Sequence, residues 1–233
     1  MTKFQYAPKI METFPSLIGG VIIAENIQPI SDKDGLFDAY RQQQQATIAR
    51  IGDTPLSQIP SLSAWRAAFR KFDIDPTKYR SAAESLLRRL TKKGDIPSIN
   101  TLVDIGNLVS VRYAMPVAVF DTRFIDTPLT VHFADGTEEF TPLGRKEIEH
   151  PQEGEVIFSD ESKQVSARRW CWRQSDQSAA QAGTTDAIIT VEAHHTGANA
   201  DIQKALDDLA QLLKTYCDAD CSISVLDTET LAV

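Results

Sequence analysis

Residues 97–121 limit most strongly what this chain can fold into. The first half is an apolar run that contains Asp104 and Asn107, which predicts a largely buried helix. Pro116 ends helical pairing because it lacks a backbone N–H, and Val117–Asp121 then predicts a short buried strand. A polar group left unpaired in such a helix costs about 1–3 kcal/mol. Asp104 and Asn107 therefore either tie loops to the core, or Asn107 faces a pocket.

Hydrophobic periodicity predicts further elements on both sides of this stretch. Helices precede most of the strands, so we expect an α+β fold with a mixed, largely antiparallel sheet and flanking helices. No linker divides the chain, which favours a single domain over residues 1–233, with residues 1–55 forming an N-terminal strand–helix extension. The expected helices span 36–50 (Gln42–Gln45 on its solvated face), 61–72, 82–93 and 202–216, and the expected strands 16–27, 129–133, 138–143, 153–158, 164–172, 186–192 and 222–226.

Composition restricts the partners. The 233 residues are 42% hydrophobic and 24% charged, as in ordinary globular proteins. A net charge of −8 argues against a broad nucleic-acid footprint and against a DNA partner, but an acidic protein can still dock one RNA end on a basic face. The densest basic patch lies on the expected helix 82–93, as a solvated face or a phosphate contact, and consists of Arg88, Arg89, Lys92 and Lys93.

The sequence also indicates where the protein resides. No apolar stretch approaches the ~18 residues that a membrane span needs, and the N-terminus has no signal-peptide pattern. Three cysteines in a large chain suit a reducing compartment. We therefore expect a cytoplasmic protein with no membrane partner.

Common catalytic and metal motifs do not occur in the sequence. It has no phosphate-binding loop, no dinucleotide fingerprint and no nucleophile elbow. Cys217 and Cys221 supply only two of the four ligands of a zinc site. His194 and His195 are adjacent and point to opposite faces of a strand. We expect neither a metal nor another cofactor, and without an ATP-binding motif the chain is not a ligase by itself.

A second concentrated stretch runs from Arg168 to Gln177. On a strand, Trp170 and Trp172 share one face. Arg168 lies on the same face, whereas Arg169, Cys171 and Arg173 lie on the other. Two tryptophans beside arginines can form a stacking floor for a ring or a base. Alternatively, the tryptophans close the core and the arginines pair with surface acids.

The sequence from Leu102 to Asp121 resembles the DVTNYV…GQPxHAFD stretch of the B3/4 domain, the editing domain in the beta subunit of bacterial phenylalanyl-tRNA synthetase. The match is carried by Asp104, Asn107, Pro116, Phe120 and Asp121. The segment Arg168–Asp176 is similar to the RxWxWRxSD segment of stand-alone B3/4 proteins. The resemblance covers roughly residues 60–215.

This resemblance implies hydrolysis of an amino acid wrongly attached to tRNA, with water as the nucleophile. The implied catalytic residues are Asn107 and Glu192; in the family, the residue matching Glu192 recognises a substrate hydroxyl. The family's pocket threonine and histidine fall on Gly106 and Ala118, so substrate identity is not inherited. The implied substrate-binding residues are Trp170, Trp172, Arg173, Asp176, Gly106 and Ala118, and the RNA-contact residues Arg88, Arg89, Lys92 and Lys93.

The leading hypothesis is a stand-alone B3/4 protein that hydrolyses a mischarged aminoacyl-tRNA in trans and binds its acylated 3′ end and amino-acid moiety. A second hypothesis is a non-catalytic module that binds an amino acid, a nucleotide or an RNA end. A third is a pure interaction protein whose pocket is filled by the tryptophans.

Overall fold

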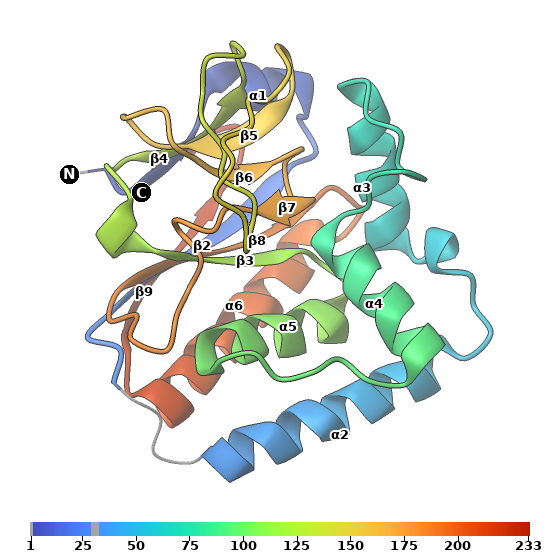
Figure 1. Cartoon of the computed structure of the whole chain (residues 1–233). Helices are drawn as coiled ribbons and strands as arrows, with labels where there is room; N and C mark the ends of the chain where they lie inside the picture. The colour runs from blue at the N-terminus through green and yellow to red at the C-terminus, as the bar shows by residue number, and fades with distance from the viewer. Residues whose placement is uncertain (1, 29–32) are drawn as a thin grey trace.

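The computed structural model describes residues 2–28 and 33–233 and confirms an α+β fold (Figure 1). The helices are α1 (Pro8–Thr13), α2 (Lys33–Ile51), α3 (Pro60–Lys71), α4 (Ala82–Lys93), α5 (Thr101–Tyr113) and α6 (Ala198–Cys217), with short 3-10 turns at Leu56–Gln58 and Thr122–Phe124. The strands are β1 (Phe4–Tyr6), β2 (Ile18–Glu25), β3 (Val117–Asp121), β4 (Leu129–Phe133), β5 (Val156–Ser159), β6 (Val165–Arg168), β7 (Arg173–Gln174), β8 (Ala187–Ala193) and β9 (Asp220–Leu226).

The strands form two sheets where the sequence predicted one. One sheet has the order β1-β4-β5-β6-β7 and the other β3-β8-β2-β9. All of these pairs are antiparallel except β1–β4. The first 28 residues contribute to both sheets, because β1 pairs with β4 and β2 lies between β8 and β9.

The central strands β2 and β8 of the four-stranded sheet are largely buried on both faces. Ile22 and Ile189 belong to one apolar cluster with side chains of α2, α5 and α6. Val21 and Ile188, their neighbours in sequence, belong to a second cluster with side chains of the five-stranded sheet and of α3. The molecule is therefore layered as helices, sheet and sheet, with α3 and α4 at one side (Figure 1). Residues two apart on β8 share a face, so the even-numbered ones face the second sheet.

The helix and strand predicted within residues 97–121 are confirmed. α5 begins after Asn100, whose side chain accepts a hydrogen bond from the Val103 N–H at 3.0 Å. The Asp104 carboxylate accepts hydrogen bonds from the Ser98 hydroxyl and from the Ile99 N–H. Asp104 thus ties the loop before α5 to the helix, which satisfies a buried carboxylate.

One predicted strand is wrong. Residues 138–143 do not return beside β4, which pairs with β5 and β1 instead. The Glu138 carboxylate turns back and accepts the N–H groups of Asp135 and Gly136 at 2.9 and 3.0 Å. This contact closes the predicted turn locally and leaves isolated bridges in place of the second strand of a hairpin.

The predicted solvated face of α2 is also wrong at Gln44. Its side chain is buried, donates to the Ile96 carbonyl at 3.0 Å and accepts from the Ile96 N–H at 2.8 Å. An amide side chain can both donate and accept, so Gln44 bonds the N–H and C=O of Ile96 in the way that a neighbouring strand would.

We predict that Gln44→Ala lowers the free energy of unfolding by about 1–3 kcal/mol, because the buried backbone N–H and C=O of Ile96 lose their partner. Urea denaturation measures the change. The matched control is Gln45→Ala, at an exposed position on the same helix, with an expected change within about 0.5 kcal/mol. Equal effects of the two variants would show that the Gln44–Ile96 bonds do not stabilise the fold.

Candidate functional site

A small pocket opens between the two sheets at the face of β8 that points toward the five-stranded sheet. β8 contributes Thr190 and Glu192, and β3 contributes Ala118, which pairs in register with Thr190. The segment after β6 contributes Trp170 and Trp172. The open volume is about 60 Å³. Alternation along two neighbouring strands therefore brings these side chains to one place.

Glu192 is the buried carboxyl group of this pocket. Its Oε1 accepts hydrogen bonds from the Tyr6 hydroxyl at 2.7 Å and from Trp170 Nε1 at 3.0 Å. No hydrogen bond from the described residues reaches Oε2. Both lone pairs of Oε1 are occupied, and the Trp170 N–H can only donate. With the Tyr6 hydroxyl donating in this arrangement, a proton on Glu192 sits on Oε2.

Burial controls the charge of Glu192. Loss of solvent raises the pKa of its carboxyl group from 4.5 to about 7, while the hydrogen bonds from Trp170 and Tyr6 oppose this rise. A group with a pKa near the working pH is available both as a proton donor and as a proton acceptor. Glu192 can therefore exchange a proton at Oε2, near neutral pH, with a molecule in the pocket.

Tyr6 reaches Glu192 because β2 leaves room for its ring. Gly19 pairs in register with Glu192, and a Cβ on Gly19 would lie 2.2 Å from the Tyr6 hydroxyl oxygen. The close approach therefore requires glycine at position 19. The N-terminal strands thus supply a direct contact to the pocket's carboxyl group.

The predicted strand 164–172 ends early, which changes the position of the tryptophans. β6 stops at Arg168, and Arg169 and Trp170 adopt left-handed backbone angles, with φ of 44° and 58°. The Arg169 N–H donates to Glu155, and the Trp170 N–H donates to the Val156 carbonyl at 2.6 Å. The two tryptophans therefore do not share a strand face. Trp170 is fully buried against Glu192, and Trp172 stays at the rim.

A stack of aromatic rings and guanidinium groups forms this rim. The Arg169 guanidinium lies over the Tyr79 ring at 4.0 Å and over the Trp172 ring at 4.6 Å. Arg173 lies over Trp172 at 4.6 Å as well. Such contacts hold flat groups in place and leave Arg173 exposed to a ligand.

Three predicted site residues lie away from the pocket. Asn107 is on α5, beside the Tyr40 hydroxyl of α2 and on the helix-covered face of the sheet. Gly106 allows α5 to approach β3, since a Cβ there would lie 3.2 Å from Val119. Asp176 is exposed and accepts a hydrogen bond from a loop N–H. The structure brings together Glu192, Trp170, Trp172, Arg173 and Ala118, and does not bring Asn107 to Glu192.

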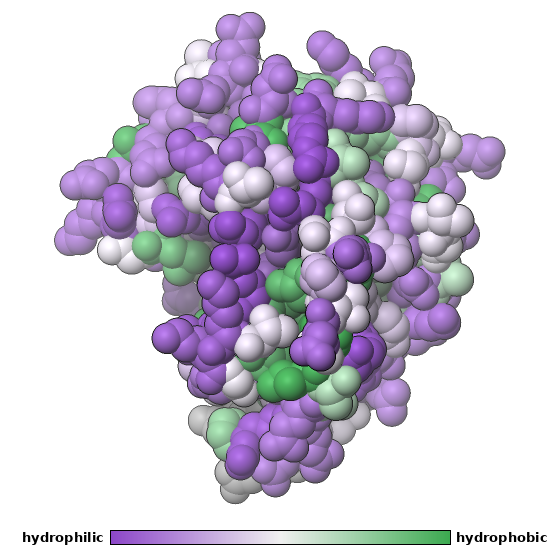
Figure 2. Space-filling model, turned by 90° about the vertical axis from the view of Figure 1, so that its right-hand side faces the viewer, coloured by the Kyte–Doolittle hydropathy of each residue, from purple (hydrophilic) through white to green (hydrophobic). Residues whose placement is uncertain are grey.

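The predicted basic patch on α4 divides into two halves. Arg88 and Lys92 line an open groove of about 490 Å³ together with Arg66 and Arg80. Arg89 instead bonds the Asp95 carbonyl at 3.1 Å, and Lys93 is outside the groove. The side of the molecule that carries α3 and α4 is predominantly hydrophilic (Figure 2). The groove and the pocket flank the first turn of α4.

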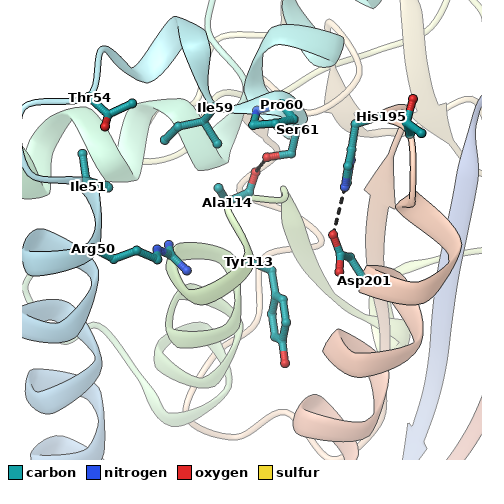
Figure 3. Close-up of a pocket in the computed structure, with 11 residues that line it drawn as sticks. Arg50, Ile51, Thr54, Ile59, Pro60, Ser61, Tyr113, Ala114, His195 and Asp201 are labelled. Carbon is teal, nitrogen blue, oxygen red and sulfur yellow. Dashed lines mark hydrogen bonds and ion pairs between the residues drawn. The ribbon is translucent and has the colours of Figure 1, made fainter.

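A larger pocket of about 420 Å³ lies between the ends of α2 and α5 and the start of α6 (Figure 3). His195 Nε2 pairs there with the Asp201 carboxylate at 3.1 Å. The neighbouring His194 points elsewhere, into the aromatic cluster with Trp65 and Trp170. None of the predicted site residues lines this pocket.

The Cys171 thiol also lines the pocket beside Glu192. Burial raises the pKa of the Cys171 thiol well above its usual range, so the nucleophilic thiolate is not formed near neutral pH. Within the described part of the chain, no three metal-ligating side chains gather, and no helix is long and apolar enough to cross a bilayer.

The chain belongs to the B3/4 domain family, whose sequence profile matches residues 64–218. This match confirms the resemblance drawn from the sequence. Among solved structures, the chain is similar to an N-terminal fragment of the phenylalanyl-tRNA synthetase beta-subunit from Pyrococcus horikoshii, at 13% identity and a TM-score of 0.48. The alignment covers 94% of this chain and 50% of that fragment. No curated protein matches the chain.

Sequence reasoning missed three contributors to the site. Thr190 is two residues before Glu192 on β8, and strand alternation could have placed it on the same face. Tyr79 and Tyr6 carried no such signal. Tyr6 is 186 positions from Glu192 and lies outside the family match.

We predict that Glu192→Gln changes how stability depends on pH. The folded pKa of Glu192 lies above its ordinary value of 4.5, so the wild-type carboxyl destabilises the fold as pH rises from 4.5 through about 7. From pH 5 to pH 8, the variant should therefore gain roughly 2–3 kcal/mol of stability relative to wild type.

The wild-type and variant proteins are compared as a difference because His194 changes stability in the opposite direction over an overlapping pH range. Burial lowers the pKa of its imidazole from 6.5 to about 3, so its contribution to stability increases as pH rises through that interval. Urea denaturation at several pH values measures the difference. Glu12→Gln, at an exposed position, should run parallel to wild type. A pH-independent difference for Glu192→Gln would contradict the buried, protonated carboxyl.

Proposed function

We propose that this protein hydrolyses a mischarged aminoacyl-tRNA in trans, with Glu192 as the proton-transfer group. The observation that carries the proposal is the geometry of Glu192. One carboxyl oxygen accepts hydrogen bonds from Tyr6 and Trp170, and the other is free at the pocket. The pKa of this carboxyl group is near neutrality. The membership of the chain in the B3/4 family supports the substrate class.

The reaction needs water and one proton shuttle. Ionised Glu192 Oε2 accepts a proton from a water molecule as the water oxygen bonds to the carbonyl carbon of the aminoacyl ester. The bond between that carbon and the ribose oxygen of the tRNA then breaks. The ribose oxygen takes the proton from Glu192, which releases the amino acid and restores the tRNA hydroxyl. A positioned water is sufficient as the nucleophile, so the reaction does not need a thiolate at Cys171, whose pKa is raised by burial.

The surroundings of the pocket support binding of an RNA end. In the groove, Arg88 and Lys92 supply cations for phosphates, whereas Arg66 and Arg80 pair with the Glu84 carboxylate at 2.7 and 3.8 Å. The chain as a whole has a net charge of −8. Between groove and pocket, Trp172 packs edge-to-face on Tyr79 at 5.0 Å. Aromatic and guanidinium surfaces bind unpaired bases by stacking. The acylated 3′ end would then pass from the groove over the rim into the pocket. The proposed location of the protein is the cytoplasm, where tRNA is charged.

A second candidate function is binding of an amino acid or an RNA end without chemistry. The position of Asn107 favours it, because this predicted catalytic residue lies on the other face of the sheet from Glu192. The two candidates differ in whether the bound ester is cleaved.

We predict that the purified protein releases one non-cognate amino acid from a panel of correctly and incorrectly charged tRNAs, well above the spontaneous rate. Loss of the proton acceptor in Glu192→Gln should lower that rate about 10²–10⁴-fold and leave tRNA binding within about twofold. Single-turnover deacylation and filter binding measure the two quantities. A flat panel with retained binding would favour the second candidate, and a fully active Glu192→Gln variant would remove Glu192 from the mechanism.

We predict that the double variant Arg88→Ala/Lys92→Ala weakens tRNA binding and reduces its dependence on salt. Loss of two phosphate contacts should lower the slope of log affinity against log salt by about 1.4–1.8. Arg89→Ala/Lys93→Ala removes the same charge from the same helix outside the groove. Measurement of tRNA affinity over a series of salt concentrations compares the two double variants. Equal losses in the two variants would mean that net charge, and not the groove, drives binding.

A further inference from the structure

The dimensions of the pocket limit what can enter beside Glu192. The open volume is about 60 Å³. A dry cavity of ~150 Å³ accommodates one benzene-sized ring, which sets the scale for this space. Phe158 and Ala167 of the five-stranded sheet and Ala118 of β3 form its apolar sides. A benzyl or phenol side chain, with seven or eight non-hydrogen atoms, exceeds this space.

The wall made by Trp170 is fixed, so the pocket does not widen by a simple rotation of this ring. The indole donates to Glu192 at 3.0 Å, and the Trp170 main chain donates to the Val156 carbonyl. The ring also makes edge-to-face contacts with Phe14 at 4.8 Å and with Trp65 at 5.0 Å. The side chain is fully buried, and rotation of the ring would break its hydrogen bond to Glu192 and these ring contacts.

Two polar atoms in this small space are not used by the protein. Glu192 Oε2 and the Thr190 hydroxyl have no hydrogen-bond partner among the described residues. Thr190 is 1% exposed and lines the pocket, two residues from Glu192 on the same face of β8. Most buried hydroxyl groups in proteins are hydrogen-bonded. The site therefore accommodates a water at Glu192 and a second hydrogen-bonding group at Thr190.

We propose that the substrate of this pocket is an aminoacyl ester with a side chain of serine size that carries a hydroxyl. This inference rests on the proposed hydrolysis and names its substrate class. The side-chain hydroxyl bonds Thr190 Oγ1, the side-chain methylene contacts Ala118, and Glu192 holds the reacting water. Larger and aromatic side chains are rejected by the Trp170 wall. A side chain without a hydroxyl, such as the methyl group of alanine, leaves Thr190 unpaired.

The test measures single-turnover deacylation of seryl-, alanyl- and tyrosyl-tRNA by the wild-type protein, Thr190→Val and Thr190→Ser. Wild type should cleave the seryl ester at least about tenfold faster than the alanyl ester, with no detectable cleavage of the tyrosyl ester. Thr190→Val keeps the size of the side chain and removes its hydroxyl, so the seryl preference should fall to about equality. Thr190→Ser keeps the hydroxyl and should retain the preference.

A second variant tests size independently of the hydroxyl. Ala118→Leu adds three carbons to a pocket side that is only partly buried, so the fold should persist, as checked by urea denaturation. Cleavage of the seryl and alanyl esters should then fall together. Rapid cleavage of the tyrosyl ester but not of the seryl ester would overturn this inference and leave the hydrolase standing. An unchanged seryl preference in Thr190→Val would also overturn it, whereas cleavage of no ester would overturn the proposed function itself.

Discussion

The structure depends on one buried carboxyl group. Glu192 lies on the central part of the molecule, where the face of the four-stranded sheet meets the five-stranded sheet. A buried carboxyl without donors would be strongly unfavourable, and two aromatic side chains from distant parts of the chain supply them. The contacts satisfy one oxygen and leave the other at the pocket. The same arrangement thus joins the two sheets and exposes a proton-transfer group.

The backbone accepts unfavourable conformations to make this arrangement. Arg169 and Trp170 are left-handed in succession, at roughly 1–2 kcal/mol for each residue. Burial of the indole and the contacts of Glu155 and Val156 with this turn offset that energy. Gly19 is needed on the opposite side, where a methyl group would meet the Tyr6 hydroxyl. Strained backbone that holds a pocket side chain is common at functional sites.

The sequence predicted what depends on local pattern. Strand and helix periodicity placed α5, β3, β8 and α6, and motif spacing pointed to Glu192, Trp170, Trp172 and Arg173. The errors arose where side chains satisfy backbone groups, as Gln44 does for Ile96 and Glu138 does for its own turn. The pairing of Asn107 with Glu192 could not be tested from spacing, because it depends on which face of the sheet α5 covers. The contact of Tyr6 with Glu192 joins two ends of the chain and leaves no trace in local sequence.

The pH dependence of hydrolysis is the most direct measurement of the role of Glu192, since ionised Glu192 is the proposed proton acceptor. Single-turnover rates on the most rapidly cleaved aminoacyl-tRNA, corrected for spontaneous hydrolysis, would be measured from pH 5.5 to 8.5. We expect a rate that rises with pH to a plateau, with a midpoint near the Glu192 pKa of about 7, and loss of this step in Glu192→Gln. A corrected rate that does not change over this range, or a midpoint retained in Glu192→Gln, would show that Glu192 is not the proton acceptor.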